Sequence, residues 1–114
     1  MSSLSNLKVL DLTSHLSGPY CAMILADHGA DVVKIEKPNE GDQLRKTPPF
    51  QSGESAPFML WNRNKRSVTL DLKDLKDHQL LLKMVEAADI MIENFKPGTA
   101  SRLGIDYVLS LIHI

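Results

Sequence analysis

The sequence has a single cysteine, Cys21, among its 114 residues. One cysteine excludes an intrachain disulfide and any metal site built from several thiolates. Three of the histidines, His28, His78 and His113, show no metal-ligand spacing with one another or with the cysteine. Zinc sites draw on such spacings, so the sequence predicts no metal site.

An excess of either charge is also missing. Thirteen lysines and arginines face fourteen aspartates and glutamates, which gives a net charge of −1. A general nucleic-acid binder normally carries a basic excess. We therefore expect no nucleic-acid partner, and a local basic loop on this neutral chain suits a small anionic ligand better.

Long apolar runs are absent as well. No run approaches the roughly 20 residues that cross a bilayer, and the N-terminus shows no charged segment followed by the apolar stretch of a signal peptide. We expect no membrane association and a cytoplasmic location, with an organelle matrix as the alternative. The hydrophobic content of 43% and charged content of 24% are typical of a globular chain, and its length is that of about one small domain.

Glycine is scarce where a nucleotide fingerprint would need it. The loop from Ser14 to Pro19 has one glycine, Gly18, whereas the dinucleotide pattern needs G-x-G-x-x-G. Glu36 does stand where that pattern places its ribose-binding acid, at the end of an expected strand. The glycines nevertheless disfavour NAD binding, and the P-loop pattern is absent from the sequence.

Short β-type runs and helical stretches alternate along the chain, in the order β-α-β, a long loop, then β-α-β-α. The pattern predicts strands at 8–13, 31–36, 68–72 and 89–93, and helices at 19–30, at 74–88 and from 99 to 103. This order implies parallel strands with right-handed crossovers. The expected fold class is α/β: a Rossmann-like partial parallel sheet with helices on both faces, half of a doubly wound sheet.

The two longer helices have recognisable sides and ends. In the first, Pro19 suits the opening turn and Gly29 the end, and one side carries, at helical spacing, Cys21, Ile24, Leu25 and His28. In the second, Asp74 and Asp77 favour the N-terminus. Its apolar stripe comprises Leu80, Leu81, Met84, Val85 and Ala88.

The stretch from Asn62 to Lys73 concentrates hydrogen-bond donors before a strand, with the cations Arg63, Lys65 and Arg66. It is either a phosphate-binding loop or a solvated charge cluster. Its context, beside Trp61 and downstream of the Pro/Gly-rich segment 37–57, favours ligand binding, because long loops in compact domains are often functional. The expected contacts lie at its far end, and the three cations serve mostly to hold the loop and its dimer neighbours.

Two further loops follow expected strands, where ligands of open α/β sheets gather. His15 lies in the first, and we interpret it as a solvated loop histidine. The second is the turn from Glu93 to Gly98, which combines an amide, an aromatic ring and a lysine. It is either a site for a flat heterocycle and a phosphate or an ordinary strand-to-helix turn.

Three motifs, at residues 10–38, 62–73 and 88–104, together resemble the N-terminal part of the class III coenzyme A transferases of the CaiB/BaiF type. The resemblance spans about residues 5 to 108. The spacer at 41–55 is similar to the transferases rather than to the related α-methylacyl-CoA racemases. The resemblance implies an interlocked homodimer that acts on an acyl-CoA and a small carboxylic acid, with coenzyme A (CoA) as substrate and no permanent cofactor.

The resemblance also implies a set of CoA-binding positions. Leu16 replaces a polar residue of the formyl-CoA transferases, which disfavours a formyl substrate. Lys37 would lie near the nucleotide, and Arg102 would reach a phosphate. The implied CoA-binding residues are Ser14, Leu16, Ser17, Lys37, Leu70, Asp71, Leu72, Lys73, Asn94, Phe95, Lys96 and Arg102.

The family's catalytic residue is an aspartate that would lie beyond residue 114, and no aspartate of this chain matches it. We expect residues 1–108 to be the N-terminal part of a CoA-transferase large domain and the apolar 109–114 to be a truncated or non-native tail. The chain alone is expected to be inactive. The alternatives are an acyl-CoA racemase or epimerase of the same fold, and a non-catalytic nucleotide-binding module.

Overall fold

The computed structural model describes residues 3–99 of the chain. Its centre is a four-stranded sheet in the order β5-β2-β1-β6, in which all neighbours are parallel. The strands are β1 (Lys8–Asp11), β2 (Asp31–Glu36), β5 (Arg66–Thr69) and β6 (Ile90–Ile92). This is the order 3-2-1-4 of the first half of a doubly wound sheet, so the predicted fold class is confirmed.

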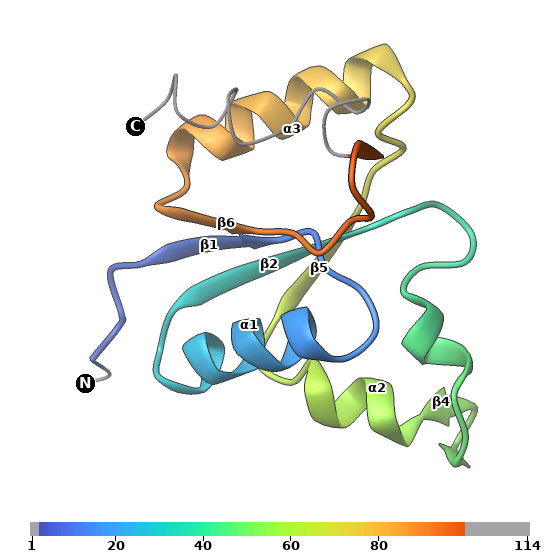
Figure 1. Cartoon of the computed structure of the whole chain (residues 1–114). Coiled ribbons are helices and arrows are strands. Elements are labelled where there is room, and N and C mark those ends of the chain that lie inside the picture. Colours follow the sequence, from blue (N-terminus) through green and yellow to red (C-terminus); the bar gives the residue numbers. More distant parts are fainter. Residues whose placement is uncertain (1–2, 100–114) are drawn as a thin grey trace.

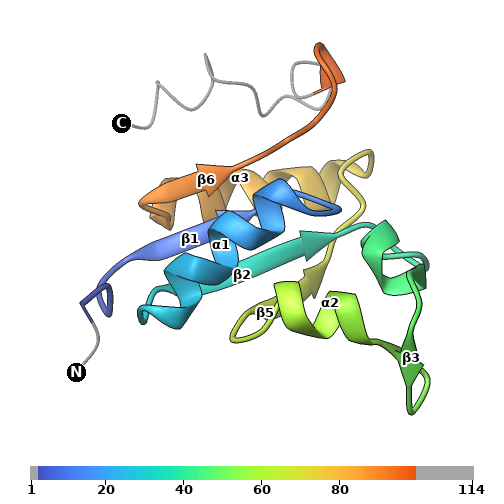
Figure 2. The ribbon, with the colours of Figure 1, turned by 60° about the horizontal axis from the view of Figure 1, so that its bottom comes forward.

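Helices cover both faces of the sheet (Figures 1 and 2). One face lies under α1 (Ser17–Asp27) and α2 (Ala56–Trp61), and the other under α3 (Leu75–Ala87). The segment between β2 and α2 contains the 3₁₀ helix η1 (Gln43–Lys46) and a hairpin of β3 (Phe50–Gln51) with β4 (Glu54–Ser55). No helix within residues 3–99 is long and apolar enough to cross a bilayer.

The face under α3 is an apolar core. Its buried residues are Leu10, Leu12, Ile35, Leu70 and Leu81. Leu81 is fully buried, and Met84, Val85 and Ala88 of the predicted stripe pack beside it. Leu80 is 47% exposed, so its place in that stripe was wrong. Successive residues of a helix are rotated by about 100° around its axis. Because Leu81 points into the core, the preceding Leu80 points to the side of it.

The face under α1 uses small residues. Ala22, Ala26 and Ala30 pack with Val9 and Val32, so the helix can lie close to the strands. Of the side named from spacing, Leu25 packs against this core, whereas Cys21 and His28 are exposed and Ile24 is 39% exposed. Small side chains face the strands because a close approach of helix and sheet leaves little room for long side chains.

The helix ends agree with the sequence only in part. Asp74 accepts a hydrogen bond from the Asp77 backbone N–H at 3.2 Å, which confirms the predicted cap of α3. Helix α1 begins at Ser17 rather than Pro19. A side chain at Gly18 would place its Cβ 2.3 Å from Thr13 Cβ, so this first turn packs against the end of β1 only with glycine there.

The third predicted strand is displaced along the chain. It was expected at 68–72, but β5 ends at Thr69. The Leu70 N–H still donates to the Glu36 carbonyl at 3.0 Å, and the chain then leaves the sheet. That departure turns residues 70–73 into a loop at the edge of the sheet. The helix expected from Thr99 to Leu103 lies almost wholly outside the described residues.

Candidate functional site

A pocket of about 510 Å³ opens where the four parallel strands end. Its walls are the loops that follow β1, β2, β5 and β6, and the carboxyl ends of such strands form the usual ligand crevice of an open α/β sheet. The lining residues are Leu12, Thr13, Ser14, Lys34, Ile35, Glu36, Lys37, Gly41, Asp42, Gln43, Leu70, Asp71, Leu72, Lys73, Asn94, Phe95, Lys96 and Thr99.

Most of the CoA-binding positions expected from the sequence come together around this pocket. The ones that line it are Ser14, Lys37, Leu70, Asp71, Leu72, Lys73, Asn94, Phe95 and Lys96. Leu16 and Ser17 are exposed at the start of α1 and do not line it. Arg102 lies outside the described residues.

The pocket combines cations with apolar surface. Lys37, Lys73 and Lys96 line it together with leucine side chains and Phe95. Lys37 pairs with Glu40 at 3.1 Å, and both side chains are more than half exposed. Neither Lys73 nor Lys96 has a carboxylate partner within residues 3–99. Such a surface can bind a flat apolar group that carries several negative charges.

Asn94 fastens two of the pocket loops together. Its Oδ1 accepts a hydrogen bond from the Ser14 N–H at 3.1 Å, and its Nδ2 donates to the Ser14 carbonyl at 2.8 Å. The amide group thus spans the loops after β1 and β6. Asn94 therefore shapes the pocket as well as lining it.

The wall formed by residues 70–73 is attached to the start of α3. The Asp77 carboxylate accepts from the Asp71 N–H at 2.8 Å, and the Asp71 carboxylate accepts from the Lys73 N–H at 3.0 Å. These bonds hold the backbone around Lys73, which is a condition for a cation to meet a ligand in a fixed place.

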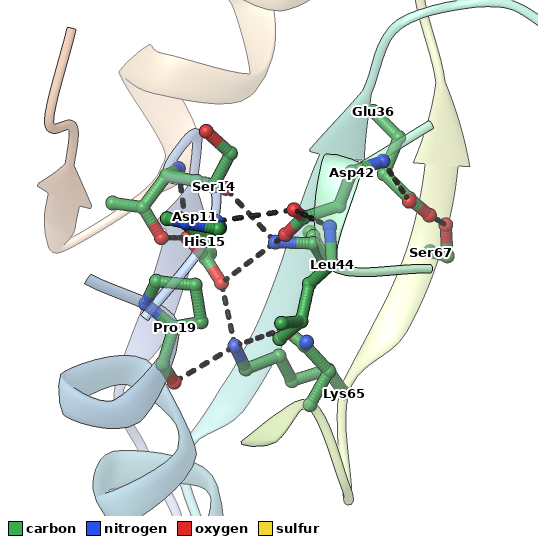
Figure 3. Close-up of polar contacts among 12 residues, drawn as sticks. Asp11, Ser14, His15, Pro19, Glu36, Asp42, Leu44, Lys65 and Ser67 are labelled. Carbon is green, nitrogen blue, oxygen red and sulfur yellow. Dashed lines mark hydrogen bonds and ion pairs between the residues drawn. The ribbon is translucent and has the colours of Figure 1, made fainter. Parts of the chain in front are cut away.

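A cluster of buried charges adjoins the pocket, and two of its members, Lys34 and Asp42, line it. We call it the buried charge cluster: Asp11, Lys34, Asp42 and Lys65. Figure 3 labels Asp11, Asp42 and Lys65. Lys34 Nζ lies 2.9 Å from Asp42 Oδ2 and 3.8 Å from Asp11 Oδ2, and it donates to the Thr13 carbonyl at 2.9 Å. Each of the four side chains is at most 2% exposed. Two cations and two anions balance, which is how charged groups are tolerated in an interior.

Lys65 supplies the second cation from the turn before β5. Its Nζ donates to Asp11 Oδ2 at 2.7 Å, to Asn62 Oδ1 at 2.7 Å and to the Pro19 carbonyl at 3.0 Å. Burial lowers the pKa of Lys65 below its ordinary value, against the opposing effect of Asp11. The lysine is thus enclosed by protein oxygens and is not offered to a ligand.

These contacts favour a structural role for the cations Arg63, Lys65 and Arg66 over phosphate binding. Each of its three cations already has a carboxylate partner: Arg63 with Asp27 at 2.6 Å, Lys65 with Asp11 at 2.7 Å, and Arg66 with Asp31 at 2.7 Å. The three pairs agree with the expectation that these cations hold the loop, whereas the contact with dimer neighbours stays a prediction. The partners lie 36, 54 and 35 residues earlier in the chain, so no local pattern reveals them.

Glu36 anchors the loop that follows β2. It accepts from Arg45 Nε at 2.7 Å, from Arg45 Nη2 at 2.8 Å, from the Ser67 hydroxyl and from the Asp42 N–H at 2.9 Å. Burial raises the pKa of Glu36, but the bonds from Arg45, Ser67 and Asp42 outweigh it and lower the pKa to about 2. Arg45 also lies 3.9 Å from the centre of the Phe58 ring. With its oxygens so engaged, Glu36 is not a free ribose-binding acid.

Sequence reasoning missed Asp11, Lys34 and Asp42, although one signal was present. Asp11 and Lys34 are charged residues within mostly apolar strands, and they lie opposite each other in the register of β1 and β2. Side chains paired in parallel strands share a face of the sheet. Opposite charges within two neighbouring apolar strands therefore indicate a buried pair.

His15, predicted to be solvated, is indeed exposed. Within residues 3–99, no three histidine, cysteine or acidic side chains are grouped to hold a metal ion.

Known proteins resemble this chain in sequence and in architecture. Residues 4–110 match CoA-transferase family III. A succinyl-CoA:mesaconate CoA-transferase from Haloarcula hispanica is 49% identical over 112 residues, which cover 94% of this chain and 28% of that protein. The human succinyl-CoA:glutarate CoA-transferase is 40% identical over 105 residues, which cover 91% of this chain and 24% of that protein.

A solved structure gives the same result in three dimensions. A CaiB/BaiF family protein from Brucella suis superposes with a TM-score of 0.91 at 38% identity, over 98% of this chain and 31% of that one. The chain thus spans about a quarter of the length of the curated relatives it matches. The family match over nearly the whole chain, together with this superposition, shows that the chain belongs to CoA-transferase family III.

Proposed function

We propose that this chain is the CoA-binding N-terminal part of an acyl-CoA:carboxylate CoA-transferase, and that the pocket holds the nucleotide end of CoA. The observation that carries the proposal is the pocket itself. It lies at the carboxyl ends of the strands and places Lys37, Lys73 and Lys96 beside leucines and Phe95.

The chemistry of CoA fits these walls. Its nucleotide end carries an adenine ring, a diphosphate and a further phosphate on the ribose. An aromatic and aliphatic surface accepts the ring, and separated lysines suit several phosphates, since a phosphate monoester has a charge of roughly −1.5 to −2 at neutral pH. Charge-assisted hydrogen bonds from lysine to phosphate are stronger than neutral ones.

The proposed reaction moves CoA between carboxylic acids. In the mechanism that the family resemblance implies, an aspartate attacks the thioester and forms covalent acyl and CoA adducts on the enzyme, which is nucleophilic catalysis by a carboxylate. We place that aspartate in the protein beyond residue 114. This chain then supplies CoA binding and not the nucleophile.

Binding of CoA by the complete protein tests the proposal. We expect Lys73→Ala or Arg102→Ala to weaken CoA binding roughly tenfold, because a hydrogen bond to a charged group contributes about 1.5 kcal/mol or more. Each should also reduce the salt dependence of the affinity. Titration calorimetry at two salt concentrations measures both. Lys83→Ala, on the exposed side of α3, removes the same charge away from the pocket and should change neither.

Unchanged affinity in both the Lys73 and the Arg102 variants would remove the phosphate role from these two residues. The substrates to assay first are succinyl-CoA with a dicarboxylic acid, because the Haloarcula and human relatives are named for mesaconate and glutarate. Turnover of an acyl-CoA by the isolated 114-residue chain would contradict the placement of the nucleophile beyond it.

The proposed assembly is a homodimer whose two chains interlock. Large apolar side chains remain exposed on α1 and α2, including Tyr20, Met59 and Leu60, and such surface is costly when left in water. Light scattering of the complete protein should give the mass of a dimer. A monomer at micromolar concentration would exclude the interlocked assembly.

A further inference from the structure

The buried pair Lys34–Asp42 lines the pocket and joins the loops that follow β1 and β2. We infer that Lys34 and Asp42 are positioning residues for the pocket: they fix the segment 37–44 against the turn that follows β1, and CoA affinity depends on that fixed shape. The identity of the ligand rests on the proposed function, but the positioning role does not.

Lys34 connects the sheet to the turn after β1. It belongs to β2, and its ammonium group donates to the Thr13 carbonyl at 2.9 Å and lies 2.9 Å from Asp42 Oδ2. Both side chains of the pair are 1% exposed. An ion pair enclosed in this way is not loosened by water, so its geometry is passed on to the segments it joins.

Asp42 binds three segments through different atoms. Its Oδ1 accepts from the His15 N–H at 3.1 Å and from the Leu44 N–H at 2.9 Å, and its own N–H donates to Glu36 Oε1 at 2.9 Å (Figure 3). Its Oδ2 accepts no hydrogen bond from the described residues and faces the Lys34 ammonium as an ion pair. One carboxylate thus holds the turn after β1 and the start of η1, while the backbone N–H ties the segment to the end of β2.

The backbone at both ends of this connection lies in the left-handed region, which is unfavourable for His15 and readily adopted by Gly41. His15 has φ 75° and Gly41 has φ 66°. A non-glycine residue is uncommon in that region, and the bond from His15 to Asp42 is one that holds it there. At position 41 a side chain would put its Cβ 2.8 Å from Glu36 Oε1, so the segment lies as close to β2 as glycine allows.

The connection continues to the far wall of the pocket. Ser14, between Thr13 and His15, is bound through both its N–H and its carbonyl to the Asn94 side chain. The loops after β1, β2 and β6 are therefore linked through Asp42 and Asn94. A shift of segment 37–44 would move Lys37, which stands at its start and lines the pocket.

Stability alone does not account well for such a pair. Desolvation of two charges offsets most of their attraction, so apolar replacements are often neutral or stabilising. What an ion pair adds is a requirement for one geometry. That requirement falls here on loops that surround a pocket and not on the apolar core under α3.

The test uses the complete protein with two variants and a control. Asp42→Asn keeps the shape of the side chain and removes its charge. Lys34→Gln/Asp42→Asn removes both charges and leaves Asp11 paired with Lys65 at 2.7 Å, so no buried charge lacks a partner if the single variant fails to fold. The control, Asp31→Asn, breaks the exposed pair with Arg66 at the opposite end of β2.

Two measurements separate positioning from general stability. Amide hydrogen exchange of the ligand-free protein should speed up roughly tenfold at residues 13–15 and 41–44 in both variants, with the exchange of α3 unchanged. CoA titration should show a roughly tenfold loss of affinity in both. The control should change neither quantity at these sites.

A double-mutant cycle with Lys37→Ala adds the decisive readout. Because Asp42 acts through the segment that carries Lys37, the effect of Lys37→Ala on CoA affinity should shrink in the Asp42→Asn background. Full additivity would overturn the inference, as would unchanged exchange at 41–44 or unchanged affinity in a folded variant. Absence of CoA binding by the unsubstituted protein would defeat the proposed function instead, and hydrogen exchange would then decide the positioning role alone.

Discussion

The face of the sheet under α3 buries leucine and isoleucine, whereas the face under α1 and α2 buries alanines, valines and four charged side chains. Both faces exclude water, but through different forces. Apolar packing is non-directional and stabilises any close fit, whereas hydrogen-bonded charges are satisfied in few arrangements. The comparison teaches that the α3 face supplies cohesion, while the α1 face determines where the pocket loops lie.

The largest expected effect comes from removing a charge inside the α1 face. Lys65→Met would leave Asp11 with Lys34 at 3.8 Å as its remaining cation within residues 3–99. We expect a loss of about 3–5 kcal/mol in the free energy of unfolding, because an uncompensated charge would stay buried. Urea denaturation measures it. A loss below about 1 kcal/mol would mean that the cluster is effectively solvated and that the two faces differ little.

The apolar face should respond nearly as strongly but for another reason. Leu81→Ala would open a cavity in the core under α3, where Leu81 is fully buried, and should cost about 2–5 kcal/mol. Leu80→Ala is the matched control on the same helix, since that side chain is 47% exposed and little burial is lost. Equal losses in the two variants would contradict the assignment of the packed side of α3.

An acid titration should distinguish Glu36 from exposed carboxylates. Its pKa in the folded protein is lowered from 4.5 to about 2. A lowered carboxyl pKa stabilises the fold above the unfolded value and loses that contribution as pH falls through the folded one. We therefore expect stability from Glu36 to be complete above about pH 4.5 and to decline toward pH 2.

Arg45→Met tests the cause of that shift. Without the bonds from Arg45 the effect of burial gains weight, so the pKa of Glu36 should rise and acid unfolding should begin at higher pH. Lys46→Met is the control. It removes the positive charge of the next residue, whose side chain is 66% exposed and whose Nζ lies 3.9 Å from Glu40 Oε1. An equal shift of the acid transition in both variants would assign the effect to net charge instead of to the contacts of Arg45.

The smallest loss of stability is expected at Arg66, the residue next to Lys65, where the largest is expected. Arg66→Met breaks the pair with Asp31, in which the side chains are 69% and 46% exposed. Exposed pairs contribute about 1 kcal/mol or less, and added salt should reduce even that. Thermal or urea unfolding at low and high salt measures it. If Arg66→Met lowered the free energy of unfolding as much as Lys65→Met, burial would not explain the difference expected between these neighbouring cations.

Much of the fold could be predicted from the sequence because its signals are local. Strand β2 was placed from Asp31 to Glu36 as found, and Asp74 was recognised as the cap of α3. The side of α1 that packs could not be recognised from spacing alone. The residues of α1 that pack with Val9 and Val32 are alanines, and their place depends on how closely the helix approaches the strands.

The candidate site was predictable to a similar extent. Residues after each strand were expected to gather, since the carboxyl ends of parallel strands share one edge, and loops 70–73 and 94–96 do line one pocket. The bonds that shape it were not predictable. Asn94 is joined to Ser14 across 80 residues of sequence, and nothing in either loop specifies that partner.

The sequence by itself determined the order of the four parallel strands and the two long helices, the family and the residues that follow each strand, because periodicity, turn residues and motifs are read locally. Only the tertiary structure decided which cations of the basic loop are buried. Lys65 and Arg66 are neighbours of like charge. Lys65 is buried and pairs with Asp11, whereas Arg66 is exposed and pairs with Asp31 at the surface. The physical reason is that burial and pairing depend on residues brought together by the fold from 35 to 54 positions away.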